Sequence, residues 1–181
     1  MKLYHFSEDN GMVSFAPRVP EHRDDVDAYV WAIDEEHAPM YYLPRDCPRA
    51  CFWPGANTND ADRERWFGGI EARLVIAVES GWLERIRSTT LYRYEMPAES
   101  FSLHGNDTTA GHWVSRETVA PLSVEPVGDL LDAIAASDVE LRITPRLMQL
   151  WQRVIASTLA YSGTRLRNAQ GYEEFEAGRG A

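Results

Sequence analysis

Lysine is almost absent from this chain, whose 18 basic residues include a single lysine, Lys2. A P-loop needs a lysine after its glycine-rich turn, so that class of nucleotide-binding protein is excluded. No Gly-x-Gly-x-x-Gly follows an expected strand, which argues against a dinucleotide-binding Rossmann sheet. The 28 acidic residues outnumber the basic ones and give a formal net charge of −10. Because nucleic-acid binding proteins must neutralise many phosphates, we do not expect general nucleic-acid binding.

Long hydrophobic runs are also missing. The longest strongly apolar segment, Leu74–Val78, is far shorter than the ~20 residues that span a bilayer as a helix. The first residues lack the apolar core of a secretory signal. We therefore expect a cytoplasmic protein without a membrane partner.

Cysteine is scarce, with two residues in the whole chain. Cys47 and Cys51 lie four positions apart, which is the spacing of neither a redox Cys-x-x-Cys pair nor half of a zinc site. We expect both to be reduced and structural, in agreement with a cytoplasmic compartment.

The pattern of apolar residues predicts the class of fold. Short β-like runs alternate with turn signals over the first two-thirds of the chain, and Glu71–Glu79 is the most continuous of them, typical of a central strand covered on both faces. Helical spacing then follows at Val127–Ile134 and again after Thr144 and Pro145. We predict one strand-rich α+β domain over residues 1–163 with helices near its C-terminus. A loose polar tail is expected over residues 164–181.

A further short helix is expected over Glu35–Tyr42. Asp34 can accept hydrogen bonds from its first backbone N–H groups, and acidic residues suit the first turn. Pro44 would end this helix.

Several short motifs resemble those of a known fold. The chain opens with Tyr4-His5-Phe6-Ser7, continues with Phe15-Ala16-Pro17-Arg18, and later has Val30-Trp31-Ala32-Ile33-Asp34 leading to Tyr41-Tyr42. A late segment, Gly111–Glu117, completes the set. Together they resemble the ADP-ribosyltransferase-like fold. The first motifs are also similar to those of small bacterial proteins with a Tyr-His-Phe-Ser start and a Trp-Ala-Ile-Asp-Glu-Glu-His-Ala-Pro core, a family that implies no activity.

The resemblance to the ADP-ribosyltransferase-like fold implies a cleft for the cofactor NAD. His5 would hydrogen-bond the nicotinamide ribose, Ser7 would support the end of the first strand, and Tyr41 or Tyr42 would stack on the nicotinamide ring. An aromatic face suits a flat cationic ring, and a fixed donor suits a ribose that develops oxocarbenium character. The residues expected to contact the cofactor are His5, Ser7, Arg18, Trp31, Tyr41, Tyr42 and Arg45.

The motifs depart from the family pattern at three positions. Phe6 stands where the family has glycine, and Val30 stands where an aromatic residue is common. His112 occupies the place of the family's acid, which stabilises the transition state of transfer. Either Glu117 supplies that acid, with His5, Tyr41, His112 and Glu117 as the catalytic set, or the protein does not catalyse transfer.

Two other clusters offer different chemistry. Carboxylates at Asp34–Glu36 with His37 belong to the ligand types of a divalent metal, and a metal-dependent hydrolase could use His5, His37 and His112. Adjacent residues of one helical turn point in different directions, so we expect a capping acidic turn and no metal.

The second cluster is the pair Arg45 and Arg49 in a proline-flanked segment. With Arg18, these guanidinium groups could clamp a diphosphate, or they could form surface pairs with neighbouring acids.

The sequence therefore supports three functional hypotheses. The first is an NAD-binding, ADP-ribosyltransferase-like transferase with a small nucleotide as ligand. The second is a non-catalytic binding or regulatory domain on the same scaffold, and the third is the metal-dependent hydrolase. The acceptor of any transfer and the oligomeric state are left open.

Overall fold

The computed structural model describes residues 1–19, 27–105 and 110–179. The chain is an α+β protein, as its sequence predicts. Backbone contacts divide it into two compact units, each with its own sheet. Unit 1 comprises Met1–Tyr42 and Thr90–Gly128, and unit 2 comprises Leu43–Thr89 and Asp129–Ala181. A single domain over residues 1–163 stays a prediction.

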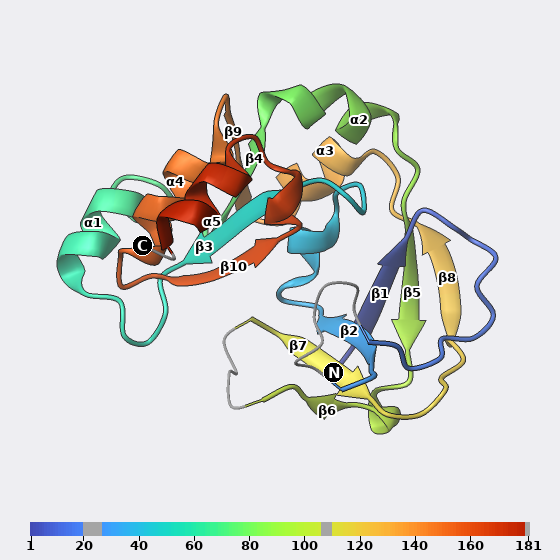
Figure 1. Ribbon diagram of the computed structural model, residues 1–181. Helices are drawn as coiled ribbons and strands as arrows, with labels where there is room; N and C mark the ends of the chain where they lie inside the picture. The colour runs from blue at the N-terminus through green and yellow to red at the C-terminus, as the bar shows by residue number, and fades with distance from the viewer. Residues whose placement is uncertain (20–26, 106–109, 180–181) are drawn as a thin grey trace. The chain divides into compact units, whose positions relative to one another are not determined.

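Unit 1 is built on an antiparallel sheet in the order β6-β7-β2-β1-β5-β8 (Figure 1). Its elements are β1 (Leu3–Ser7), β2 (Val30–Asp34), the 3-10 turn η1 (Ala38–Tyr41), β5 (Tyr92–Met96), the 3-10 turn η3 (Ala98–Ser100), β6 (Ser102–Leu103), β7 (His112–Ser115) and β8 (Ser123–Pro126). Three of the four motifs lie on β1, β2 and β7, which are neighbours in this sheet.

The two faces of the unit 1 sheet differ in character. Alternation along the strands places Leu3, Ala32 and Tyr94 in the apolar core of one face, which Phe15 also joins. The opposite face carries the row Tyr4, Ile33 and His112, because these residues are direct partners across β1, β2 and β7. The second face is therefore the one on which the histidine of β7 lies.

The prediction of a helix over Glu35–Tyr42 is wrong in its extent. The structure has a turn at residues 35–37, followed by the 3-10 turn Ala38–Tyr41. Asp34 Oδ1 does accept the backbone N–H of His37, at 2.9 Å. Pro39 lies in the first turn of η1, where proline is tolerated, and the 3-10 turn ends at Tyr41.

Unit 2 has a four-stranded sheet in the order β10-β3-β4-β9, in which β4 and β9 are parallel and the other pairs antiparallel. Its elements are β3 (Arg49–Trp53), α1 (Asp60–Phe67), β4 (Leu74–Glu79), the 3-10 turn η2 (Ser80–Trp82), α2 (Leu83–Ser88), α3 (Leu130–Ala135), β9 (Val139–Thr144), α4 (Leu147–Ile155), β10 (Ala160–Thr164), the 3-10 turn η4 (Leu166–Asn168) and α5 (Tyr172–Arg179). Every residue of β4 is buried, which confirms the predicted central strand.

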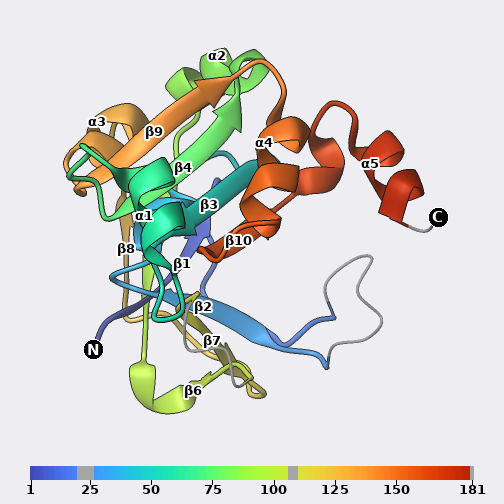
Figure 2. The same ribbon diagram turned by 90° about the vertical axis from the view of Figure 1, so that its left-hand side faces the viewer.

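One face of this sheet is covered by α1 and α4, and α5 lies beyond α4 (Figure 2). Phe52 and Val75 from the strands pack there with Trp66 of α1 and Trp151 of α4. Phe175 of α5 belongs to the same core and is 7% exposed. Residues 164–179, which were expected to be loose, therefore differ from that expectation, because the Phe175 ring is buried in the core of unit 2. Residues 180–181 lie outside the described residues.

Within the described part of the chain, no helix has the length and apolar character needed to cross a bilayer.

Candidate functional site

The candidate site lies where β1 and β2 separate. These strands pair only at Leu3 with Asp34 and at Tyr4 with Ile33, although β1 continues to Ser7 along β5. Beyond that point the His5 side chain replaces the strand pairing, with Nδ1 at 2.9 Å from the Trp31 carbonyl oxygen. A carbonyl only accepts hydrogen bonds, so Nδ1 of His5 is the donor and the orientation of its ring is set.

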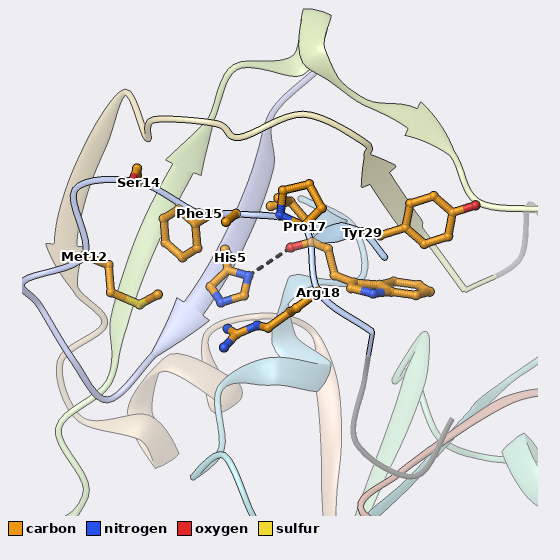
Figure 3. A pocket seen from close by; sticks show the side chains of 10 residues that line it. His5, Met12, Ser14, Phe15, Pro17, Arg18 and Tyr29 are labelled. Carbon is orange, nitrogen blue, oxygen red and sulfur yellow. Dashed lines mark hydrogen bonds between the residues drawn. The ribbon is translucent and has the colours of Figure 1, made fainter. Parts of the chain in front are cut away.

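A pocket of ≈ 280 Å³ opens beside this separation (Figure 3). It is walled by a histidine, an arginine and three aromatic rings, together with small and apolar residues. The lining residues are His5, Met12, Ser14, Phe15, Ala16, Pro17, Arg18, Tyr29, Val30 and Trp31. No acidic side chain is among them.

Backbone bonds fix the segment that closes one side of the pocket. Phe15 and Val119 exchange hydrogen bonds of 2.8 and 2.9 Å, and Arg18 and Tyr29 exchange two of 3.2 Å. The Phe15 ring is buried and lies 4.7 Å from the His5 ring, centroid to centroid. These bonds hold both ends of the pocket-lining segment Phe15–Arg18, one end to Val119 and the other to Tyr29, the residue before β2.

Trp31 has a buried polar atom. Its indole Nε1 is inaccessible to solvent and finds no hydrogen-bond partner among the described residues. Buried donors in native proteins are almost always paired, which makes this N–H an exception among the described residues.

Tyr41 and His112 form a hydrogen bond of 3.0 Å between the phenol oxygen and Nε2, across 71 residues of sequence. The Tyr41 ring stacks on Phe6, with ring centroids 6.3 Å apart and planes inclined by 11°. The His112 ring in turn meets the Trp31 ring edge-on at 6.1 Å. Trp31 therefore contacts both His112 and, through its carbonyl, His5.

Asp34 and His37 make a second polar pair, at 2.8 Å between Oδ1 and Nδ1. Burial acts to raise the pKa of Asp34, but the hydrogen bonds from the side chain and backbone of His37, with the charges of His37 and His112, lower this pKa below its usual value. Gly111 packs directly against the pair with φ +69° and hydrogen-bonds Asp34 N through its carbonyl at 3.0 Å.

The structure brings some of the expected site residues together. His5, Arg18 and Trp31 line the pocket, and Tyr41 and His112 form the neighbouring pair on the face that carries Trp31. Tyr41 and His112 are not among the pocket-lining residues.

The other residues that the sequence predicted for the site do not line the pocket. Glu117 is exposed after the end of β7 and its backbone N–H bonds Ser115. Ser7 is buried and accepts the backbone N–H of Asp9 at 3.1 Å. Tyr42 meets Phe6 edge-on at 5.4 Å. Arg45 belongs to unit 2.

The expected ligands of the hydrolase hypothesis are each engaged separately. His5 bonds a carbonyl, His37 bonds Asp34 and His112 bonds Tyr41. Over residues 1–19, 27–105 and 110–179, no three histidine, cysteine or acidic side chains form a group able to hold a metal ion.

Two rings next to Trp31, those of His104 and Tyr29, were not predicted from the sequence to belong to the site. His104 lies 4.6 Å from Trp31 and 5.7 Å from Tyr29, centroid to centroid. Tyr29 and Trp31 are two positions apart, so the period of an extended chain would have placed both on one face. Nothing local marks His104, because it reaches the cluster from a loop.

Fold and site together define an α+β protein with two sheets and a histidine- and aromatic-lined pocket in the first unit. The chain belongs to DUF6886, a family of unknown function whose model matches residues 4–169. Comparison with curated proteins gave no match, and neither did comparison with solved structures.

Proposed function

We propose that unit 1 binds the dinucleotide NAD, with the nicotinamide ribose in the pocket beside His5, on an ADP-ribosyltransferase-like scaffold. The observation that carries the proposal is the pocket itself, in which an oriented histidine, an arginine and aromatic walls meet. A flat cationic ring is attracted to aromatic faces, and a guanidinium binds phosphate oxygens through charge-assisted hydrogen bonds.

The size and polarity of the pocket support a partial enclosure of the ligand. Its 280 Å³ is at the lower end of ligand pockets, which run from roughly 300 to 1,000 Å³, so one half of a dinucleotide fits and the other half extends outward. The ring of Trp31 supplies part of the aromatic wall for the nicotinamide. The strands β1, β2 and β7 carry motifs that resemble the ADP-ribosyltransferase-like fold, and they are neighbours in the sheet. This arrangement supports the proposed scaffold.

We propose binding without ADP-ribosyl transfer as the function. Transfer needs an acid near the reacting ribose, and none of the described residues that line the pocket is acidic. His112 stands at the place of that acid and is hydrogen-bonded by Tyr41, while Glu117 is exposed. The role that fits is a regulatory or sensing domain that responds to NAD.

The test is titration of the full chain with NAD, followed by calorimetry and thermal unfolding. At a hundredfold excess over the dissociation constant, NAD should stabilise the protein by about 2.7 kcal/mol. Trp31→Leu removes this ring and should weaken NAD binding about fivefold, which is the worth of one contact between an aromatic face and a cation. Arg18→Gln should weaken NAD binding roughly tenfold.

Trp113→Leu is the matched control. Trp113 packs against the apolar core of unit 1 but does not line the pocket. Equal losses in the Trp31 and Trp113 variants would overturn the placement of the ligand, and no response to NAD at all would overturn the proposal. Release of nicotinamide that depends on His5 would replace binding with transfer.

A further inference from the structure

A second pocket lies within unit 2, between α4 and the start of α5 (Figure 2). Its volume of ≈ 480 Å³ falls within the range of small-ligand pockets, which is roughly 300 to 1,000 Å³. Its wall differs from that of the pocket in unit 1, because it carries charges of both signs and several carboxamides. The polar side chains that line it are Arg146, Gln149, Gln152, Gln170 and Glu174.

A buried carboxylate fixes the two sides of this pocket relative to each other. Glu79, at the end of β4, is 2% exposed. Its Oε1 accepts the backbone N–H of Leu147 and that of Gln170, each at 3.1 Å. The first bond holds the start of α4, and the second holds the chain just before it turns into α5. The pocket is therefore preorganised, which lowers the cost of binding a ligand.

The floor of the pocket is apolar, and a glycine turn shapes its rim. Met148 and Phe175 are both buried and both line the pocket. Gly171, also in the lining, has φ +82° and leads the chain into α5. A Cβ at this glycine would lie 3.9 Å from Glu174 Oε2, so the Glu174 carboxylate lies close to the turn.

The two charged groups of the wall are not neutralised by each other. Arg146 and Glu174 face the same pocket, but neither side chain forms an ion pair or a hydrogen bond with another described residue. The same holds for the side chains of the three glutamines, and all five are exposed. Their donors and acceptors are therefore bound only by water and can be transferred to a ligand.

We propose that this pocket of unit 2 binds a short peptide that has free termini and an apolar side chain. The guanidinium of Arg146 matches a carboxylate, and the carboxylate of Glu174 matches an ammonium group. Each glutamine amide offers donors and an acceptor, as a peptide group does, so the glutamines can pair with the peptide backbone. The apolar floor then accepts the side chain of the ligand.

The charges of the wall favour this class of ligand over two others. A phosphorylated ligand would be repelled by Glu174 and by the overall charge of −10. A neutral sugar would leave both charged groups without an opposite charge, whereas a zwitterion supplies one to each. All lining residues belong to unit 2, so the proposal does not rest on the function proposed for unit 1.

The test is calorimetric titration of the full chain with the dipeptide leucyl-leucine, its N-acetyl form, its C-terminal amide and free leucine. The dipeptide should bind, and each blocked form should bind about tenfold more weakly, because each has lost one charge-assisted contact. Free leucine keeps both charges but lacks the peptide group, so it should bind about fivefold more weakly. Free leucine that binds as tightly as the dipeptide would overturn the assignment of a peptide.

Two variants place the termini of the ligand in the pocket. Arg146→Gln should weaken binding of the dipeptide about tenfold and leave binding of the C-terminal amide unchanged, because the amide has no carboxylate for Arg146 to hold. Glu174→Gln should weaken binding of the dipeptide by a similar factor and leave binding of the N-acetyl form unchanged. Variants that weaken the dipeptide and the blocked forms equally would overturn the proposed pairing of charges.

Glu173→Gln and Arg63→Gln are the matched controls. Glu173 precedes Glu174 in α5, Arg63 lies on α1, and both are exposed and outside the lining of the pocket. Each control removes the same charge as its counterpart and should leave binding of the dipeptide unchanged. Equal weakening in controls and pocket variants, or no binding of leucyl-leucine to the unaltered chain, would overturn the site. Circular dichroism of all four variants establishes that they are folded.

Discussion

His5 and Trp31 illustrate how single residues shape the candidate site. The imidazole of His5 bonds a carbonyl that the separated strands leave without a backbone partner, and this bond orients the ring at the pocket. The sequence placed His5 beside core residues on a strand. It could not show that β1 and β2 pair only at Leu3 with Asp34 and at Tyr4 with Ile33 and separate at the residues before Ile33, because strand divergence depends on packing between distant segments.

Cys47 and Cys51 are residues whose chemistry follows from burial. Both are free thiols, 0% and 1% exposed. Burial raises the pKa of each to about 12, although the Arg49 charge opposes this rise. The reactive thiolate is therefore rare at neutral pH.

We predict that neither cysteine of the native protein reacts with iodoacetamide at pH 8, where a thiol of pKa ≈ 8.5 reacts readily. In a denaturant both should be alkylated, as mass spectrometry would show. Modification of the native protein within minutes would contradict the burial of these thiols.

At the scale of elements, the turn between β2 and η1 depends on the residue that precedes β7. Gly111 has φ +69°, and a Cβ there would lie 2.6 and 2.7 Å from the carboxylate oxygens of Asp34. Asp34 holds His37 at the start of η1, which ends at Tyr41. One glycine thus allows β7 to approach the turn that positions Tyr41.

We expect Gly111→Ala to lower the free energy of unfolding by about 2 kcal/mol or more, through the unfavourable φ and the displaced carboxylate. Urea denaturation measures this change. Gly81→Ala is the control, since no atom lies within 4 Å of its added Cβ and its φ is not positive. A loss as small as that of the control would show that the turn adjusts freely.

Prediction of elements succeeded where the pattern was local and strong. The buried strand over residues 74–79 follows from continuous β-branched and apolar residues. The strands β9 and β10 were not predicted. The sequence of β10, Ala-Tyr-Ser-Gly-Thr, has little β-propensity of its own, and it becomes a strand because it pairs with β3 along its whole length.

At the scale of the whole molecule, acidic side chains outnumber basic ones. Among the described residues, three aspartates have pKa values below the usual value of an aspartate. Hydrogen bonds from Arg116 and Tyr29 lower the pKa of Asp27, and hydrogen bonds from Thr158 lower that of Asp62. For Asp34, hydrogen bonds from His37 outweigh the effect of burial. In all three the folded state favours the ionised form.

A carboxyl group whose pKa is lower in the folded than in the unfolded state stabilises the protein at pH values above its unfolded-state pKa, which is 3.8 for an aspartate. We therefore predict that stability falls as the pH drops through 4 and below, when protons bind the unfolded state first. Urea denaturation between pH 3 and 6 measures this dependence, and Asp34→Asn should reduce its slope. The exposed Glu36→Gln is the control for removal of one charge, and an unchanged slope in Asp34→Asn would contradict the role of Asp34.

The sequence by itself determined the class of fold, the buried central strand and the residue types available for a site. These depend on periodicity and composition, which are properties of neighbouring residues. Only the tertiary structure decided that Tyr41 bonds His112 across 71 residues and that Arg165 joins Arg45 across 120. Such pairs form because each sheet must bury one face and pair its strands, and the partners that satisfy both demands lie far apart in the chain.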